Sequence, residues 1–158
     1  MRAIAARAGV DSALVHHYFG AKADLFAEVV GFPLRPDVAV PEILRGPREE
    51  AGANIVRFVL TAFERPTVRK RGVVLLRAAV GGKGAAPLVS AFLARELLPR
   101  IAAELDAPDA DLRAGFVASQ IAGLLIARYV VSLPQLAEAS VDEIVERVGP
   151  TVQRYLFG

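Results

Sequence analysis

The chain has 158 residues, enough for one ordinary domain or for a small N-terminal unit attached to a larger body. It contains no cysteine, which excludes disulfides, thiolate metal sites and thiol nucleophiles, and its net charge of +2 is too small to indicate a class of partner. Although 54% of the residues are hydrophobic, the longest stretch without charge, between Arg113 and Arg128, is too short to span a bilayer at roughly 20 apolar residues, and the N-terminus lacks a signal-peptide pattern.

Two short helical patterns, at residues 3–8 and 12–18, lie on either side of Gly9. Glycine has the backbone freedom that a tight turn between helices needs, and Asp11 is a natural N-cap for the second helix. Small, polar and imidazole side chains lie on the open side of that helix: Ser12, Ala13, Leu14, His16 and His17. Such side chains near a helix N-terminus suit entry into the DNA major groove and contact with phosphates. An ordinary helical hairpin of a bundle is the alternative interpretation.

A connector rich in proline and glycine is predicted at residues 31–47, with a short helical turn at residues 42–44. It separates an N-terminal unit, residues 1–30, from a body, residues 48–158. Strand patterns are almost absent, and apolar residues recur at three- and four-residue steps nearly everywhere. The sequence therefore predicts an all-α fold.

The first three helices of the body each carry an apolar stripe. The first follows Gly52, and the second ends at the glycine-rich run of residues 81–84, which is typical of a loop. The third starts after Pro87 and should kink at Pro99, because proline removes one helical donor. The stripes are, in order, Ile55, Val56, Val59, Leu60 and Phe63; Val73, Val74, Leu76 and Ala79; and Leu88, Val89, Phe92, Leu93, Leu97, Ile101 and Leu105.

Residues 112–133 are nearly apolar on all sides, so this helix should be buried by neighbours on every face. Small residues recur along it every four positions: Gly115, Ser119, Gly123 and Ala127. Such a stripe lets another helix approach closely and indicates a helix crossing or a dimer face.

The last helix, residues 141–156, has one apolar side and should bend at Pro150. That side consists of Val141, Ile144, Val145, Val148, Val152, Tyr155 and Leu156. If the two long terminal helices paired with their copies, they would form an intersubunit four-helix bundle. We therefore expect a homodimer, with Val145, Val148 and Val152 at its interface.

The segment IAARAGVDSALVHHYFGAKADLF, residues 4–26, resembles the N-terminal helix-turn-helix of the TetR family of bacterial transcriptional regulators. The likeness rests on the Ala-rich helix, Gly9-Val10, the capping residue, the aromatic-rich end of the second helix, and then Lys22 and Leu25-Phe26. It covers about 30 residues strongly, and the remaining helices resemble the family's ligand-binding and dimerisation domain more loosely. The resemblance implies contacts with bases from Ser12, Ala13, Leu14 and His16. It implies contacts with bases or phosphates from His17 and Tyr18, and a phosphate contact from Lys22.

The chain departs from the family pattern in two places. Ala21 stands where the family often has a serine or threonine cap, and the family's first helix has no counterpart. That helix would cover Ile4, Val15, Phe19 and Leu25, so we expect Met1 to be an internal or alternative start.

The resemblance implies a ligand-responsive regulator, most often a repressor, and the absence of cysteine suits a location in the reducing cytoplasm. Two recognition helices in a dimer would enter successive major grooves of a palindromic operator, about 34–36 Å apart. We expect a small apolar or aromatic effector in the body, bound by Phe58, Phe63, Phe92, Phe116 and Leu124 with Gln120 as a polar anchor. For any one of these residues, a place in the hydrophobic core is the favoured interpretation. The alternative function is a dimeric ligand-binding or interaction module that has lost DNA binding with its first helix.

Other kinds of site have weaker signals. His16 and His17 are adjacent on a helix and point about 100° apart, with no third ligand, so a metal site is not expected. The run around Lys83 lacks the spacing of a phosphate loop. A basic cluster consists of Arg65, Arg69, Lys70 and Arg71; a solvated helix start is the usual explanation, and contact with DNA or acidic lipid is the alternative. No catalytic constellation is legible, so we expect neither an enzyme nor a cofactor.

Overall fold

The computed structural model describes residues 5–6, 9–11, 13, 36–81 and 86–158, and within these ranges the ordered elements are helices, without a β-strand. The predicted all-α class is therefore confirmed. The main helices are α4 (Pro36–Leu44), α5 (Ala51–Glu64), α6 (Pro66–Val80), α7 (Ala86–Phe92), α8 (Leu98–Ala103), α9 (Ala110–Leu125), α10 (Pro134–Glu138) and α11 (Val141–Phe157). Short turns connect some of them: a 3-10 turn at Arg48–Glu50 and π-helical turns at Leu93–Leu97 and Ile126–Val130.

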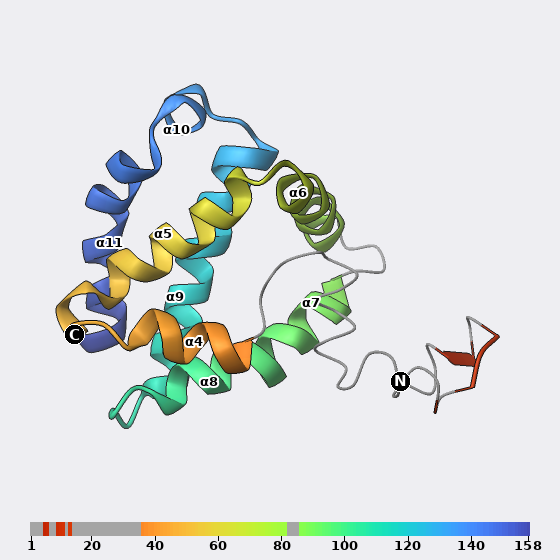
Figure 1. The fold of residues 1–158 in the computed structure, drawn as a ribbon, viewed down its shortest axis with the longest axis horizontal. Coiled ribbons are helices and arrows are strands. Elements are labelled where there is room, and N and C mark those ends of the chain that lie inside the picture. Colours follow the sequence, from red (N-terminus) through yellow and green to blue (C-terminus); the bar gives the residue numbers. More distant parts are fainter. Residues whose placement is uncertain (1–4, 7–8, 12, 14–35, 82–85) are drawn as a thin grey trace.

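Helix α5 crosses the body diagonally, and α11 packs along it (Figure 1). The two backbones approach closely at glycines: a Cβ on Gly52 would lie 2.5 Å from the Gly149 carbonyl oxygen, and one on Gly149 would lie 3.1 Å from Ala53 Cα. The most deeply buried large side chains of the core include four from these two helices: Val56, Leu60, Val152 and Leu156. Burying each contributes about 1.5–3 kcal/mol.

The side chain of Gln153 secures the start of α5 against α11. Its Oε1 accepts a hydrogen bond from the Gly52 backbone N–H at 2.8 Å, and its Nε2 donates to the Arg48 carbonyl oxygen at 2.8 Å. The first backbone donors of a helix have no partner inside the helix. A side chain from α11 therefore completes the N-terminus of α5.

The connector differs from its prediction. In place of a short turn at residues 42–44, the structure has the nine-residue helix α4, which packs against α5 and α8. Pro36 stands at the first position of this helix, where proline needs no hydrogen-bond partner, and Pro41 lies inside it. Burial of Ala39 and Val40 offsets the cost of the internal proline, which local pattern alone could not show.

The expected break at Pro99 takes the form of a change in helical pitch. The π-helical turn Leu93–Leu97 leads into α8, and Pro99 lies at the start of that helix. Proline at the first positions of a helix leaves no internal donor unpaired. The predicted long third helix is thus divided into α7, a π turn and α8.

Among the described residues, helix α9 is buried mainly on one side. Ala114, Val117, Leu124 and Leu125 are buried, whereas Leu112 is 60% exposed and Phe116 is 47% exposed. The described residues of one chain therefore do not bury this helix on every face, and the expected burial by neighbours would need a further partner. On its outer side, the described residues leave Leu112 and about half of Phe116 exposed, and Phe116 stacks on Tyr155.

The helical stretch Ala110–Val130 is long and apolar enough, by length and composition, to cross a membrane. This stretch is longer than the charge-free interval between Arg113 and Arg128, because it extends beyond both arginines. The core helix of a water-soluble protein meets the same criterion, so this feature is weak support for a membrane span.

Candidate functional site

The N-terminal turn has the geometry expected of a helix-turn-helix, as far as the described residues show it. Gly9 has a φ of +68°, in the left-handed region that glycine adopts readily, and the Val10 N–H donates to the Ala5 carbonyl oxygen at 3.1 Å. Asp11 Oδ1 accepts from the Ala13 N–H at 2.8 Å, as an N-cap does. The predicted turn and cap are confirmed.

Of the predicted DNA-contacting residues, Ala13 is helical and exposed. The others lie outside the described residues: Ser12, Leu14, His16, His17, Tyr18 and Lys22. Their contacts with DNA therefore stay a prediction.

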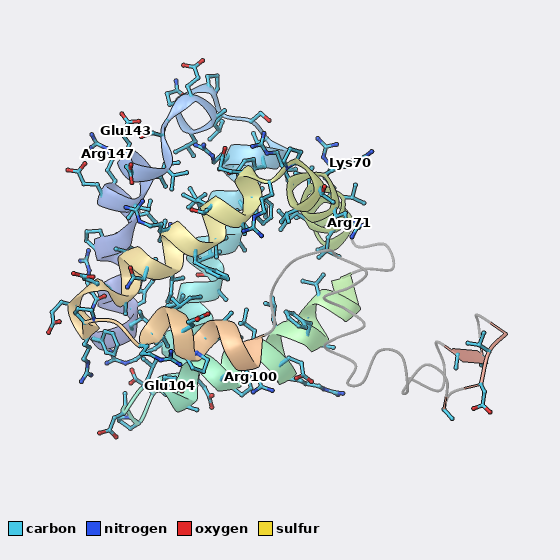
Figure 2. The ribbon with its side chains drawn as sticks, viewed as in Figure 1. Lys70, Arg71, Arg100, Glu104, Glu143 and Arg147 are labelled. Carbon is cyan, nitrogen blue, oxygen red and sulfur yellow. The ribbon has the colours of Figure 1, made fainter. Side chains whose placement is uncertain are left out.

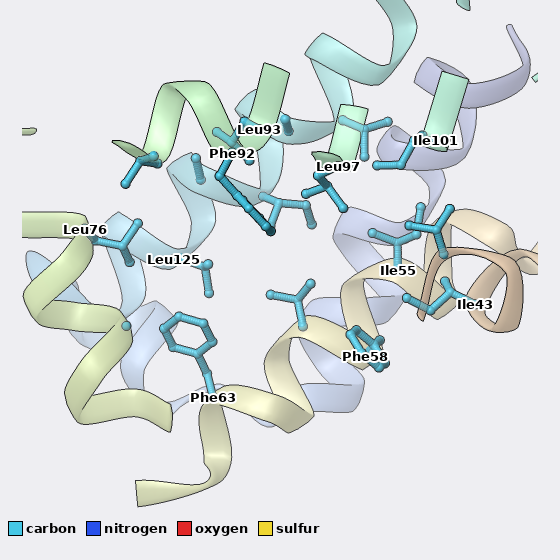
Figure 3. Close-up of a pocket in the computed structure, with 18 of the residues that line it drawn as sticks. Ile43, Ile55, Phe58, Phe63, Leu76, Phe92, Leu93, Leu97, Ile101 and Leu125 are labelled. Carbon is cyan, nitrogen blue, oxygen red and sulfur yellow. The ribbon is translucent and has the colours of Figure 1, made fainter. Parts of the chain in front are cut away.

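A cavity of about 230 Å³ lies among the helices of the body (Figure 3). Its walls come from α4, α5, α6, α7, α8 and α9 and from the first π turn. All of the described residues that line it are glycine, alanine, valine, leucine, isoleucine or phenylalanine. The cavity therefore offers a ligand dispersion contacts and burial of apolar surface, and no charged or hydrogen-bonding side chain from the described ranges.

Three of the predicted effector-binding residues line the cavity, namely Phe58 and Phe63 from α5 and Phe92 from α7. The other three do not line it. Phe116 lies on the outer side of α9 and stacks on Tyr155, with ring centroids 5.5 Å apart, while Leu124 is buried in the core and Gln120 is half-buried. On α9 the cavity is lined instead by Val117, Ala118, Ile121, Ala122 and Leu125.

The ring of Phe63 forms one wall of the cavity and is held from two other directions. It stacks on Tyr129 with centroids 5.2 Å apart. Helix α6 approaches it at Gly72, where a Cβ would lie 2.6 Å from Phe63 Cζ and 2.8 Å from Cε1. Only a residue without a side chain fits at position 72 while the ring keeps this place.

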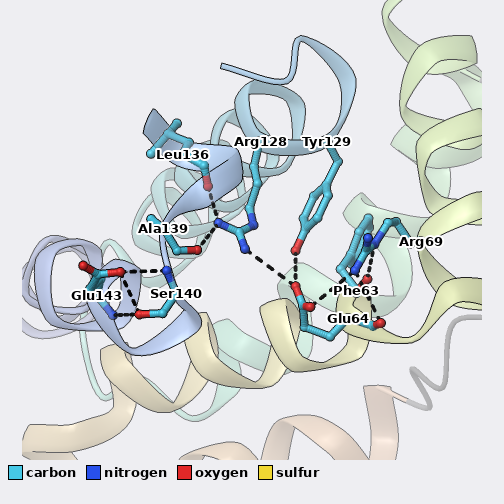
Figure 4. A network of polar contacts seen from close by, with 9 residues as sticks. All are labelled: Phe63, Glu64, Arg69, Arg128, Tyr129, Leu136, Ala139, Ser140 and Glu143. Atoms are coloured by element: carbon cyan, nitrogen blue, oxygen red, sulfur yellow. Dashed lines mark hydrogen bonds and ion pairs between the residues drawn. The ribbon is translucent and has the colours of Figure 1, made fainter. Parts of the chain in front are cut away.

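A polar network lies behind that wall (Figure 4). Glu64 Oε1 accepts from the Tyr129 hydroxyl at 3.2 Å and lies 3.7 Å from Arg128 Nη2, while Glu64 Oε2 lies 3.3 Å from Arg69 Nη2. Arg69 Nε also donates to the Phe63 carbonyl oxygen at 3.0 Å. Burial of the Tyr129 ring raises the pKa of its hydroxyl, so the tyrosine is a neutral donor near pH 7.

Arg128 is the buried member of this network, with 7% of its surface exposed. Its Nη1 donates to the carbonyl oxygens of Leu136 and of Ala139, the latter at 2.8 Å. The guanidinium thereby connects the second π turn, the end of α5 and the segment that leads into α11. Sequence analysis missed this residue, although one arginine inside an otherwise apolar helix was a signal that could have found it.

The predicted dimer positions fall into two groups. On α9, Ser119 and Gly123 are exposed and Gly115 and Ala127 are half-buried, and a Cβ added to either glycine would meet nothing within 4 Å. On α11, Val145 and Val152 are buried in the core of their own chain, and Val148 is half-buried. The apolar side of α11 faces α5 and not open space, because the two helices pair within the chain.

The remaining sequence features lie mostly on the surface. Lys70 and Arg71 are exposed on the outer side of α6 (Figure 2), whereas Arg69 turns toward Glu64. Gly81 ends α6 with its N–H donating to the Arg77 carbonyl oxygen at 2.9 Å, and residues 82–85 lie outside the described ranges. His16 and His17 also lie outside them. Within those ranges, no group of three histidine, aspartate or glutamate side chains converges.

Both the N-terminal segment and the body of the chain match known protein families. Residues 49–156 match the family described as tetracyclin repressor-like, C-terminal domain, and residues 1–29 match the family described as bacterial regulatory proteins, tetR family. Among solved structures, the chain is similar to a TetR-family regulator from Streptomyces coelicolor A3, with a TM-score of 0.61 and 29% sequence identity. That similarity covers 97% of this chain and 80% of the other. No curated protein matches.

Proposed function

The chain belongs to the TetR family of bacterial transcriptional regulators, and we propose that it is a repressor that leaves its operator when a small apolar ligand enters the cavity of the body. Proteins of this family are regulators and in general not enzymes. The proposal that the protein responds to a ligand rests on one observation: the described residues that line the cavity are all apolar. We place this regulator in the cytoplasm, where it would have access to its DNA.

The proposed DNA-reading residues are those that the resemblance implies. Ser12, Ala13, Leu14 and His16 would face base edges, His17 and Tyr18 would reach bases or phosphates, and Lys22 would hold a phosphate. The family match over residues 1–29 and the Asp11 cap support this assignment.

We propose a homodimer formed through the outer side of α9. This side is apolar and exposed at Leu112 and Phe116, and Gly115 and Gly123 leave room for the backbone of a second helix. Ser119 and Ala127 would continue the contact, and Val148 could reach it from α11. Val145 and Val152 would support the dimer only indirectly, because their side chains fill the core of one subunit.

Coupling between ligand and DNA would follow from this arrangement. The cavity is lined partly by the inner side of α9, whose outer side would hold the partner subunit. A ligand that changes the packing of α9 would therefore alter the spacing of the two reading heads. Such coupling typically amounts to about 1–3 kcal/mol and is reciprocal, so DNA would weaken ligand binding by the same factor.

The test is a mobility-shift assay with the full chain on the palindrome-containing DNA beside its own gene. We expect a sequence-specific, salt-sensitive shift. The His17→Ala variant should lose about 1–3 kcal/mol if its ring contacts a base, and the Lys22→Ala variant should bind more weakly on all sequences, with a salt slope reduced by about 1. Lys70→Ala, an exposed lysine on the body, is the matched control and should bind like the wild type.

The outcome of that assay also tests the alternative function. A chain that dimerises and binds apolar ligands but gives no sequence-specific shift would be a ligand-binding or interaction module. That result would contradict the repressor proposal and leave the cavity as the functional site.

A further inference from the structure

The outer side of α6 carries positive charge that no nearby carboxylate balances. Residues 65–95 of the sequence include seven lysines and arginines and no aspartate or glutamate. On α6 itself, Lys70, Arg71 and Arg77 are exposed, and none of them forms an ion pair with another described residue. The first two point away from the body at the edge of the molecule (Figure 2). This helix therefore presents a concentrated positive charge to its surroundings.

The folding of the subunit does not explain these charges. Cations on a helix gain stability from a carboxylate three or four positions away, as Arg113 does from Asp109. The positions three and four residues from Lys70, Arg71 and Arg77 hold only proline, threonine, valine, leucine or glycine. The first two also follow the N-terminal turn of α6, the end at which a helix dipole favours negative charge. An anionic partner outside the subunit would account for their presence.

Apolar side chains are exposed among the cations. Val74 lies one turn after Lys70 and one turn before Arg77, and it is 64% exposed. Val80 follows one turn later and is 68% exposed. We call these five residues, with Arg71, the basic surface of α6. DNA phosphates would pair with its cations but would leave both valines in water, so this combination favours a partner with charge and apolar surface together.

The size of the basic surface argues against a protein as that partner. It is the outer side of one helix of 15 residues, which is about 22 Å long and about 10 Å wide. Its area of about 220 Å² is far below the roughly 800 Å² that each partner buries in a specific protein–protein interface. A lipid surface requires no matching shape, and it offers anionic phosphates beside an apolar boundary.

We propose that the basic surface of α6 docks the protein reversibly on membranes that contain anionic lipid. Lys70, Arg71 and Arg77 lie at the lipid phosphates, and Val74 and Val80 enter the boundary between headgroups and acyl chains. Docking of this kind is weak, because each cation near an anionic surface strengthens binding by only about 5-fold. It draws part of the protein to the membrane and lowers the concentration that is available to DNA.

The first experiment measures co-sedimentation of the full wild-type chain with lipid vesicles. Vesicles of phosphatidylcholine with about 30% phosphatidylglycerol are compared with vesicles of phosphatidylcholine alone, at about 0.1 M and about 1 M salt. We expect at least about 10-fold stronger binding to the anionic vesicles at the lower salt, and loss of that difference at the higher salt. Equal binding to both kinds of vesicle, or binding to neither, overturns the proposal.

The second experiment removes two charges from the basic surface. Lys70→Gln/Arg71→Gln should weaken binding to anionic vesicles by about 25-fold, and glutamine keeps a helix propensity close to that of lysine and arginine. Arg45→Gln/Arg147→Gln removes the same charge from two exposed positions elsewhere and should bind vesicles like the wild type. Helical content is compared by circular dichroism. Equal losses in the two double variants would show that net charge alone attracts the protein, and would contradict a docking site on α6.

The third experiment separates a lipid surface from DNA as the partner. Val74→Gln/Val80→Gln should weaken vesicle binding by about 5-fold and leave binding to a non-operator DNA duplex unchanged. Unchanged vesicle binding of this variant overturns docking at the lipid boundary. A loss of duplex binding in Lys70→Gln/Arg71→Gln as large as its loss of vesicle binding would assign the surface to DNA phosphates instead. The vesicle assay contains no operator, so its outcome is independent of the repressor proposal.

Discussion

At the scale of single residues, Arg128 is the charged side chain that is buried in the described part of the chain. Its guanidinium is almost fully buried, donates to the carbonyl oxygens of Leu136 and Ala139, and pairs with Glu64 across 3.7 Å. Its Nε is the buried side-chain atom that has no hydrogen-bond partner among the described residues. Buried arginines persist where their planar donors satisfy several acceptors at once, as two backbone carbonyls and a carboxylate do for Arg128.

Arg128→Met tests this role because it keeps an apolar stem and removes the donors. Each carbonyl left unpaired costs about 1–3 kcal/mol where water cannot replace the donor, so the variant should unfold at lower urea concentration. Arg147→Met, an exposed arginine on α11, is the control and should stay close to the wild type. A folded Arg128→Met protein as stable as the wild type would show that apolar packing replaces the network without loss.

At the scale of elements, α11 begins with a complete capping box. Ser140 Oγ accepts from the Glu143 N–H at 3.2 Å, and Glu143 Oε2 accepts from the Ser140 N–H at 2.8 Å. Hydrogen bonds to the Ser140 backbone and side chain, with Arg147 nearby, hold the pKa of Glu143 below its ordinary value of 4.5. This start matters because α11 supplies one side of the core against α5.

Ser140→Ala should lower the free energy of unfolding by about 0.5–2 kcal/mol, since it removes the side-chain acceptor of the cap. The measurement is urea unfolding at neutral pH and fixed protein concentration. An unchanged midpoint and slope would mean that water replaces the cap.

The carboxylate of Glu143 predicts a pH dependence. Because its pKa is lowered by folding, its contribution to stability is fully present above the ordinary value of 4.5 and is lost as the pH falls through the lower pKa of the folded state. Glu143→Gln should therefore be less stable than the wild type at pH 7 and approach it in acid. Glu146→Gln, an exposed carboxylate on the same helix, is the control. A difference between Glu143→Gln and the wild type that persists undiminished in acid would contradict this role.

At the scale of the whole molecule, the two sides of α9 differ in burial. The inner side contributes to the core and to the cavity, and the outer side is apolar and partly exposed among the described residues. The apolar surface that the described residues leave exposed is the one we propose to be covered by a second copy of the chain.

Gly123→Arg tests the proposed dimer. Its Cβ would meet nothing within 4 Å, and arginine is a better helix former than glycine by up to about 1 kcal/mol, so the subunit should fold. We expect sedimentation analysis to find a monomer at concentrations where the wild type is a dimer. Ser90→Arg places the same charge at an exposed position on α7 and should remain dimeric. A Gly123→Arg dimer as tight as the wild type would rule out α9 as the interface.

The sequence was informative where a local pattern has one physical solution. The three- and four-residue apolar steps, Gly9 followed by Asp11, and Pro99 each predicted a feature that the structure has. The sequence was less informative where burial depends on what lies opposite. Phe63 and Phe116 are the same residue type on apolar helices, yet one lines the cavity and the other lies on the outer face of α9.

The sequence by itself determined the all-α class, the family and the segment that matches the family's N-terminal domain, because periodicity, caps and short motifs act between neighbours in the chain. Three features are visible only in the tertiary structure. The apolar side of α11 packs against α5, Gly72 makes room for the Phe63 ring, and Arg128 pairs with Glu64. Each of these contacts joins residues on different helices. They depend on how the helices cross, which no periodicity within one segment specifies.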